Sequence, residues 1–218
     1  MGLRNMPDVA GEQGGRAARR SGLDSRRLIL AAARHLFVER GYASTGTRDI
    51  AAASHVPERL IFRHFGTKRQ LFYAAARAEL AEFLDTFVEQ WRMLDPASYD
   101  FEDLTTAYVS AFLDFSETHD VLFADLISLR IGTRTEEDAR PSPFADLLGG
   151  LENLATVEAR RHGLPEDGAR RNVNFTFALV VAAGLLRNVL GSDQFGRDGD
   201  RELVGQLTHF ILGGALNT

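Results

Sequence analysis

Apolar residues recur at helical spacing in the segment SRRLILAAARHLFVERG, and this pattern predicts an amphipathic helix. Asp24 precedes the segment as a suitable N-cap, and Gly41 ends it because glycine readily adopts the backbone conformation that closes a helix. The predicted apolar face consists of Leu28, Ala32, Leu36 and Phe37. Ordered structure should therefore begin near Asp24.

A second and a third helix are predicted next, with a short break between them. The segment YASTGTRDIAAAS offers Thr45 or Gly46 as the cap of a helix whose alanines permit close packing. Pro57 suits the first turn of the following helix but not the interior of the preceding one, and Gly66 ends that following helix after Phe65. Two short helices joined in this way have the arrangement of a helix-turn-helix.

The remainder of the chain is also predicted to be helical. Thr67 is a natural N-cap for a long helix with apolar residues at helical spacing that reaches Pro96. Further helices are expected at about 99–117, 120–131, 142–162, 166–190 and 200–216. No segment shows the alternation of a strand, so we expect an all-α fold with about nine helices.

Charge is distributed unevenly along the chain. Residues 1–73 hold 13 Lys and Arg against 6 Asp and Glu, whereas the rest of the chain holds 12 against 24. A basic N-terminal third on an acidic body is expected where one part meets a polyanion and the other meets something else, and chance surface charge is the alternative. Residues 1–22 are rich in Gly and Arg and predict a disordered basic arm.

The third helix divides into an apolar and a charged side. On a helical wheel, Ile61 and Phe65 share a side with Val56, which explains how the helix docks. The other side carries Glu58, Arg59, Phe62 and Arg63. A solvated charged face is the alternative, but the basic surroundings favour DNA, since the second helix of such a motif can enter a major groove.

Residues 26–72, RRLILAAARHLFVERGYASTGTRDIAAASHVPERLIFRHFGTKRQLF, resemble the DNA-binding domain of tetracycline-repressor-type (TetR) transcriptional regulators. The resemblance lies in the ILxAAxxLFxExGYxxT pattern, in RDIAAA, in a short helix that ends in an aromatic-x-x-Phe pattern, and in a lysine two residues beyond its glycine. It implies a three-helix DNA-binding domain over 23–70 and a larger helical domain over 71–218 that binds a small molecule and dimerises.

The resemblance also implies a set of DNA contacts. Thr47 and Arg48 match positions that meet a phosphate and sometimes a base edge, and Arg48 can read guanine through two hydrogen bonds. His64 and Lys68, the only lysine of the chain, match positions that commonly hold the DNA backbone. The recognition helix contributes Glu58, Arg59, Leu60, Phe62 and Arg63.

Several positions depart from the pattern of that family. His55 occupies a turn position where relatives often have glycine, and Leu60 and Phe62 lack the hydroxyls of the Thr and Tyr often found there. We expect Phe62 to stack or to touch a thymine methyl group instead. The arginines of this helix add donors and Glu58 can accept from cytosine N4, which predicts a G·C-rich operator unless these side chains reach phosphate.

Aromatic side chains are dense in the acidic body and alternate with polar ones, as they do in ligand pockets. At each of these positions the alternative is that the side chain packs in the core and contacts no ligand. His119 follows a probable helix end, where a histidine can simply interact favourably with the helix dipole. The candidate ligand contacts are Phe87, Trp91, Tyr108, Phe112, Phe115, His119, Phe123, Asn174 and Phe177.

The last two predicted helices are suited to dimerisation. RNVNFTFALVVAAGLLRNVLG is apolar on nearly every side, and RELVGQLTHFILGGAL carries an apolar stripe with small residues. A four-helix bundle from two protomers would cover both helices and set two recognition helices on a pseudo-palindrome. Burial within one protomer is the alternative.

These features together predict a dimeric repressor that a small apolar or aromatic ligand releases from a pseudo-palindromic DNA operator, with the long helix from Thr67 as the lever. The alternatives are a ligand-independent DNA-binding regulator or activator and, from another class, a helical enzyme or a protein-binding adaptor. No nucleophile elbow, phosphate loop or HExxH motif supports an enzyme, and the histidines are not clustered as in a zinc site. We therefore expect no cofactor and no metal.

Three further observations concern the compartment. The chain has no cysteine, its first residues contain no apolar stretch typical of a secretory signal, and no apolar run reaches the roughly 18 residues of a membrane span. They favour the cytoplasm, and the family resemblance implies a bacterial one, with association with the nucleoid when the protein is bound to DNA.

Overall fold

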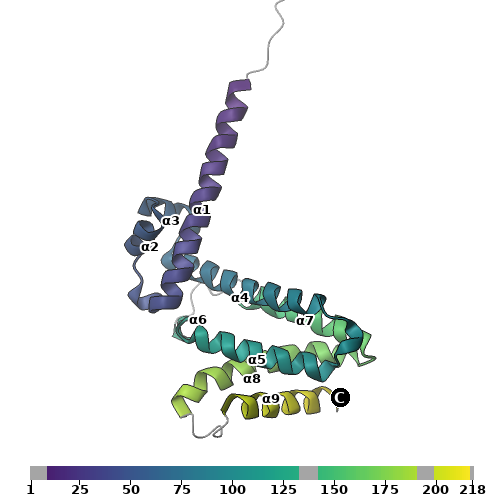
Figure 1. The fold of residues 1–218 in the computed structure, drawn as a ribbon. Coiled ribbons are helices and arrows are strands. Elements are labelled where there is room, and N and C mark those ends of the chain that lie inside the picture. Colours follow the sequence, from purple (N-terminus) through teal and green to yellow (C-terminus); the bar gives the residue numbers. More distant parts are fainter. Residues whose placement is uncertain (1–8, 133–141, 191–198, 217–218) are drawn as a thin grey trace, which may run out of the picture. The chain divides into compact units, whose positions relative to one another are not determined.

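The computed structural model describes residues 9–132, 142–190 and 199–216 (Figure 1). Within these ranges the chain forms nine α-helices and one short 3₁₀ helix and contains no strand, which confirms the all-α fold class. The helices group into two compact units, Met1–Ala75 and Ala76–Thr218, which we call the N-terminal unit and the C-terminal unit.

The N-terminal unit is built from three helices and the first turns of a fourth. They are α1 (Val9–Ser44), α2 (Thr47–Ser54), α3 (Glu58–Phe65) and the start of α4 (Lys68–Arg92). Gly41 interrupts the helical backbone of α1 with φ 77° and ψ 173°, in agreement with the helix end predicted at this glycine. The helix-turn-helix therefore has the predicted position in the chain.

Helix α1 begins earlier than the sequence predicts. It starts at Val9, so residues 9–22 are helical in the structure, whereas a disordered arm was expected over 1–22. The segment GRAARR consists largely of alanine and arginine, which are strong helix formers, and it can extend the helix once the following turns are formed. Residues 1–8 of the predicted arm lie outside the described residues.

The buried face of α1 also differs from the predicted one. Ile29, Ala33 and Phe37 are fully buried, whereas Leu28 remains 47% exposed, so the prediction of Leu28 as a core residue was wrong. Two apolar series run along this helix, one starting at Leu28 and one at Ile29, and helical spacing alone does not distinguish them. In the structure the series that starts at Ile29 is buried together with Leu36 of the other series, so the predictions of Leu36 and Phe37 as core residues are confirmed.

Side chains from all four helices form the core of the N-terminal unit. The ring of Phe37 in α1 meets the ring of Phe72 in α4 edge to face, with their centroids 5.1 Å apart. Ile50 of α2 and Ile61 of α3 are fully buried as well. Because burying such a side chain contributes roughly 1.5–3 kcal/mol, these contacts hold α2 and α3 firmly on the unit.

The turn between α1 and α2 uses both predicted capping residues, but in different roles. Gly46 occupies the N-cap position of α2, and its backbone N–H donates to Oδ2 of Asp49 at 2.9 Å. Thr45 is buried, and its hydroxyl donates to the carbonyl oxygen of Leu36 at 3.1 Å. Thr45 therefore ties the turn to α1 rather than capping α2.

The turn between α2 and α3 contains a backbone conformation that a side chain rarely adopts. His55 has φ 55° and ψ 31°, the left-handed region, and it is the one non-glycine residue with positive φ among the described residues. Its N–H and that of Val56 donate to the carbonyl oxygens of Ala52 and Ala51, which closes α2. The resembled family often has glycine at this position, and the structure supplies the reason, because glycine adopts this conformation without strain.

Replacing His55 by glycine is expected to raise the free energy of unfolding by about 0.5–1 kcal/mol. Relief of the left-handed strain, about 1–2 kcal/mol, outweighs the extra freedom that glycine gives the unfolded chain. Urea denaturation measures the difference. The same change at the exposed helical residue His35 is the control and should destabilise by about 1 kcal/mol, since that position is an ordinary helix interior. A loss of stability in His55→Gly would contradict the role assigned to the strain.

The C-terminal unit contains the remaining turns of α4 and the helices that follow. They are η1 (Pro96–Ser98), α5 (Phe101–Thr118), α6 (Asp120–Gly132), α7 (Ala145–Arg161), α8 (Glu166–Leu190) and α9 (Gly199–Leu216). Helix α4 ends at Arg92 and not at the predicted Pro96, which instead begins the 3₁₀ helix. Helices α5, α8 and α9 pack against one another, and α7 packs on α8 (Figure 1).

The core of the C-terminal unit is rich in phenylalanine. The ring centroid of Phe112 lies 5.3 Å from that of Phe83, 5.9 Å from that of Phe123 and 5.2 Å from that of Phe177. These rings come from α4, α5, α6 and α8, so one aromatic cluster joins four helices. Contacts of this kind add about 0.5–1.5 kcal/mol per pair to the effect of burial, and they give the unit a well-defined interior.

A buried carboxylate fixes the segment around η1 to α7. Glu158 accepts a hydrogen bond from the Tyr99 hydroxyl at 3.0 Å and one from Nη1 of Arg161 at 2.7 Å. Burial, followed by the hydrogen bond and the charge of Glu158, raises the pKa of Tyr99 above its ordinary value. The buried charge is thus paired, as buried charges usually are.

Candidate nucleic-acid interface and ligand cavity

Helix α3 presents the charged surface that the helical wheel predicts. Arg59, Phe62 and Arg63 are exposed, while Ile61 and Phe65 are buried against the unit. The side chains of Glu58, Leu60 and His64 are partly exposed. The helix therefore offers two guanidinium groups and one phenyl ring to a partner, and Leu60 is less available than the prediction of a DNA contact assumed.

Local sequence explains why this helix is so short and so well separated. Pro57 is the N-cap residue of α3 and has φ −55°, a value that its ring imposes. Gly66 follows the last residue with φ 80°, and its N–H donates to the carbonyl oxygen of Phe62 at 2.9 Å. A Cβ at Gly66 would lie within 3 Å of the Gln70 side chain, so glycine suits both the space and the conformation.

The structure brings three of the predicted DNA contacts together at the first turns of α2 and α3. The Thr47 hydroxyl donates to Oε1 of Glu58 at 2.6 Å, and Nε of Arg48 lies 3.8 Å from Oε2 of the same carboxylate. The Arg48 side chain is otherwise 91% exposed. Glu58 therefore lies where it partly neutralises the arginine expected to meet DNA, a role different from accepting a hydrogen bond from the cytosine N4 amino group.

Replacing Glu58 by glutamine is expected to raise affinity for DNA of unrelated sequence about fivefold, which corresponds to about 1 kcal/mol. The amide still accepts from Thr47, but it no longer competes with phosphate for Arg48, so the salt dependence should become steeper. Fluorescence anisotropy at several salt concentrations measures both effects. Glu39→Gln, which removes a carboxylate 3.3 Å from Arg40 in the same unit, is the control. If Glu58 reads cytosine, the variant will instead lose affinity for the operator selectively.

The start of α4 has the features of a phosphate-binding segment. Thr67 accepts the backbone N–H of Gln70 at 3.1 Å, which confirms it as the N-cap of this helix. Nζ of Lys68 lies 4.3 Å from the centroid of the Tyr42 ring, a contact that orients the ammonium group. A helix N-terminus with an adjacent lysine favours anions.

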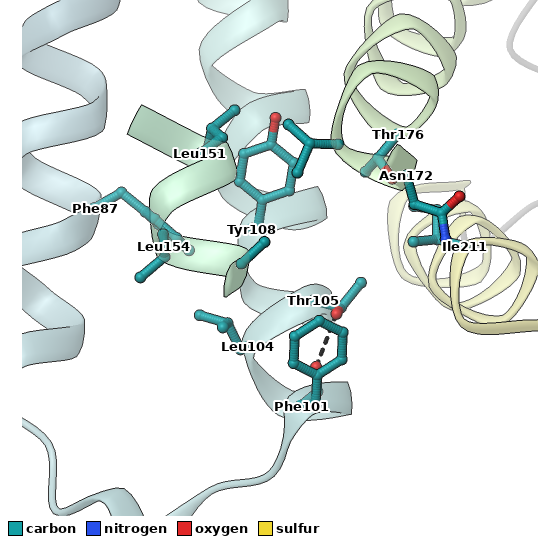
Figure 2. Close-up of a pocket in the computed structure, with 12 residues that line it drawn as sticks. Phe87, Phe101, Leu104, Thr105, Tyr108, Leu151, Leu154, Asn172, Thr176 and Ile211 are labelled. Atoms are coloured by element: carbon teal, nitrogen blue, oxygen red, sulfur yellow. Dashed lines mark hydrogen bonds between the residues drawn. The ribbon is translucent and has the colours of Figure 1, made fainter. Parts of the chain in front are cut away.

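The C-terminal unit contains a cavity of about 80 Å³ between α4, α5, α7, α8 and α9 (Figure 2). Its walls are mostly aliphatic and aromatic. The polar residues among them are Thr105, Tyr108, Asn172 and Thr176. The Thr105 hydroxyl is used locally, because it donates to the carbonyl oxygen of Phe101 at 2.7 Å.

Two polar atoms of the cavity lining are buried without a hydrogen-bond partner. They are the hydroxyl oxygen of Tyr108 in α5 and Nδ2 of Asn172 in α8. Burial raises the pKa of Tyr108 far above its ordinary value, so the phenol keeps its proton and remains a donor. An unpaired buried donor destabilises a fold by roughly 1–3 kcal/mol, and such groups commonly mark a functional site.

The predicted ligand residues fall into several groups. Phe87 and Tyr108 line the cavity, whereas Phe112, Phe123 and Phe177 belong to the aromatic core. Phe115 and His119 border a second hollow beside Glu79, and Trp91 borders a third. Asn174 is exposed and does not line the cavity. The nine residues therefore do not form one site.

Asn172 was not among the predicted residues, and the spacing along α8 does not point to it. Asn172 and Asn174 flank the buried side of α8 that Val173 and Phe177 mark, and Asn174 lies nearer to that side on a helical wheel. Only the packing of the helices shows that Asn172 lines the cavity and Asn174 does not.

His119 has contacts that a helix end explains. It is the C-cap residue of α5, and its Nδ1 lies 2.9 Å from the carbonyl oxygen of Phe115. Its Nε2 lies 3.7 Å from a carboxylate oxygen of Glu79. The described ranges contain no group of three or more His, Asp or Glu that could hold a metal ion. None of their helices has both the length and the apolar character required to cross a membrane.

Comparison with known proteins identifies the N-terminal unit. Residues 29–75 match the family described as "Bacterial regulatory proteins, tetR family", a segment that includes all of α2 and α3. The N-terminal unit therefore contains a tetR-family DNA-binding segment. This match agrees with the prediction of a regulatory protein rather than an enzyme.

Curated relatives of this chain are named as transcriptional regulators. The HTH-type transcriptional repressor Rv3405c of Mycobacterium tuberculosis is 65% identical over 43 residues, 20% of this chain and 23% of that protein. The HTH-type transcriptional activator FasR of Mycolicibacterium smegmatis is 33% identical over 123 residues, 54% of each chain. The chain thus matches from about a quarter to about half of the length of these relatives.

Solved structures of TetR-family regulators share the fold of this chain. A tetR-family transcriptional regulator from Streptomyces coelicolor has a TM-score of 0.60 at 19% identity, over 87% of this chain and 79% of that one. The transcriptional regulator FadR from Bacillus subtilis, solved in complex with stearoyl-CoA, has a TM-score of 0.57 at 14% identity, over 86% and 98% of the two chains. Both the N-terminal and the C-terminal unit therefore have counterparts in known structures.

Proposed function

We propose that this protein is a dimeric transcriptional repressor of the TetR family that binds a pseudo-palindromic operator and leaves it when a small ligand binds the C-terminal unit. The observation that carries the DNA-binding part is the exposed side of α3, with Arg59, Phe62 and Arg63, within a segment that matches the family. The first turns of α2 and α4 add Thr47, Arg48 and Lys68, and the last turn of α3 adds His64, as contacts to the DNA backbone. Such a regulator works in the bacterial cytoplasm, on nucleoid DNA.

The exposed apolar surface of α8 and α9 supports dimerisation. Phe175 is 77% exposed and Phe210 is 71% exposed, and Leu186 lies further along the same side of α8 as Phe175. Helices α8 and α9 pack against each other, and several exposed apolar side chains on neighbouring helices are typical of a protein interface. A second copy of the chain, related by a two-fold axis, would cover this surface on both protomers.

The cavity supports a response to a ligand. Helix α4 contains Lys68 in the N-terminal unit and Phe87 in the lining of the cavity, so a single helix carries residues of both proposed sites. A ligand acts if it binds the DNA-free conformation more tightly than the DNA-bound one, by about 1–3 kcal/mol in typical cases. The match to FadR, whose structure contains stearoyl-CoA, supports a small-molecule site in this unit.

Activation of transcription is the second candidate function. The match to the activator FasR covers more of the chain than the match to the repressor Rv3405c, and it extends beyond the DNA-binding segment. DNA binding would be the same in both cases, while the position of the operator relative to the promoter would differ.

An electrophoretic shift with the DNA upstream of the protein's own gene tests the proposal, followed by a reporter fused to that DNA. Repression predicts a retarded complex and reporter output that rises when the gene is deleted. Reporter output that falls on deletion would establish activation instead. The absence of any sequence-selective complex in a genomic selection experiment would overturn the DNA-binding proposal.

A further inference from the structure

We propose that residues 16–27, in the N-terminal part of α1, form a further DNA-binding element that holds the phosphate backbone next to the operator. These residues precede the segment 29–75 that matches the tetR family, so they lie outside the part of the chain with known counterparts in sequence. The proposal extends the interface of α2, α3 and α4 and rests on the proposed function. It is carried by a basic stripe on a helix that continues past α3.

Helix α1 extends well beyond the helices on which it packs. It runs from Val9 to Ser44, and α2 and α3 lie beside its C-terminal half (Figure 1). Residues 9–22 contain no apolar residue larger than valine. A helix without an apolar face gains little from packing on its own protein, so this part of α1 is suited to a polar partner.

Basic residues predominate in this part of the helix. Residues 9–28 include five arginines against two acidic residues, Glu12 and Asp24. The arginines are Arg16, Arg19, Arg20, Arg26 and Arg27. At 3.6 residues per turn, their positions fall within about a third of the helix circumference. A basic stripe along one side of a helix is typical of an element that meets a polyanion.

The stripe continues the side of α1 that faces the core of the N-terminal unit. Arg26 and Arg19 lie seven and fourteen residues before Ala33, which is fully buried, so the three positions share one side of the helix. From Ile29 onwards this side packs within the unit, whereas before Ile29 the same side carries arginine. The partner of the stripe is therefore expected on the side of α1 where α2 and α3 lie.

A contact between α1 and α3 places the start of the stripe beside the recognition helix. Cζ of Arg26 lies 4.9 Å from the centroid of the ring of Phe65, which is the last residue of α3. The Arg26 side chain remains exposed, and Phe65 directly follows His64, a proposed contact to the DNA backbone. Because a helix rises about 1.5 Å per residue, Arg16 lies about 15 Å further along the axis, a length of about four base pairs. The stripe thus begins at the end of α3 and can reach phosphates beyond the bases that α3 reads.

Neutralising the outer arginines tests the proposal on the full-length protein. The variant Arg16→Gln/Arg19→Gln/Arg20→Gln retains good helix formers and leaves Arg26 on Phe65. Fluorescence anisotropy with a labelled duplex of unrelated sequence measures affinity and its slope against salt. We expect the variant to bind about tenfold more weakly at physiological salt, and the slope to fall by about 0.9 for each arginine that contacts a phosphate. The melting temperature should not change, because residues 9–22 supply no large apolar side chain to the core.

Hydroxyl-radical footprinting locates the contact on the DNA fragment that the electrophoretic shift identifies. The wild-type protein should protect sugars up to about four base pairs further out, on both sides of the operator, than the variant does. Protection inside the operator should be the same for both proteins. The matched control is Arg77→Gln/Arg92→Gln/Arg201→Gln, which removes three exposed arginines from the C-terminal unit. It should keep the salt slope and the footprint of the wild type.

The remaining outcomes overturn the proposal. Equal slopes and footprints for wild type and the α1 variant would leave DNA binding to α2, α3 and α4 alone. A lower slope with an unchanged footprint would mean that the arginines act only through the long-range field of the protein. Unchanged DNA binding with loss of self-association in sedimentation velocity would make a second copy of the chain the partner of the stripe. A wild-type protein that binds neither duplex would instead overturn the proposed function, so the two failures are distinguishable.

Discussion

Replacing Phe175 and Phe210 together by glutamate is expected to convert the protein into a monomer and to weaken operator binding by about two orders of magnitude or more. Both side chains are exposed on α8 and α9, where a second copy would cover them. Four buried, unpaired carboxylates per dimer would prevent association. A monomer has one recognition helix per particle, and loss of the second removes the roughly 10²–10⁴-fold gain that bivalent binding provides.

Sedimentation velocity measures the association state, and fluorescence anisotropy measures operator affinity. Met93→Glu is the control, because Met93 is 81% exposed at the end of α4 and lies outside the proposed interface. It should remain dimeric and retain full affinity. A double variant that still sediments as a dimer would place the interface on another surface.

Alanine at Arg59 or Arg63 is expected to weaken operator binding about 10–100-fold, because one good contact between arginine and a base edge contributes about 1–3 kcal/mol. Both guanidinium groups are exposed on α3. The loss should be smaller for DNA of unrelated sequence, and base preference should relax at one G·C position for each arginine.

Lys68→Ala is the variant for comparison, because a contact to a phosphate group contributes the same binding energy whatever the base sequence of the DNA. It should weaken binding to operator and unrelated DNA alike, and lower the slope of affinity against salt by about one. Arg92→Ala, an exposed arginine in the C-terminal unit, should change neither. If the α3 variants behave like Lys68→Ala, these arginines hold the DNA backbone and the prediction of a G·C-rich operator fails.

Much of the fold could be predicted because its signals are local. Gly66 and Thr67 act through their own backbone conformation or a hydrogen bond three residues away, and both have their predicted roles in the structure. Pro57, predicted in the first turn of α3, lies one residue earlier as its N-cap. The bounds of α8 follow in the same way from a long apolar run between polar breaks. The early start of α1 was missed because a basic, glycine-containing segment is typical of disorder, although its alanines and arginines also form helices.

The two candidate sites differ in how much of them could be predicted. A helical wheel sufficed to separate Ile61 from Arg63 on α3, since a single short helix defines both sides. The cavity combines residues from five helices, and an aromatic side chain that lines it has the same periodicity as one in the core. The sequence therefore does not distinguish Phe87, which lines the cavity, from Phe112, which belongs to the core. The prediction of Asn174 as a ligand contact also differs from the structure, in which Asn172 lines the cavity.

Periodicity, caps and turn residues in the sequence specify the helices, the position of the helix-turn-helix and the charged side of α3, because these depend on neighbours a few residues apart. The choice between Leu28 and Ile29 in the core, the bond from Thr47 to Glu58 and the unpaired hydroxyl of Tyr108 depend on contacts between residues far apart in the chain. Such contacts exist only once the helices have packed, so the partner of each side chain can be read from the tertiary structure and not from the pattern.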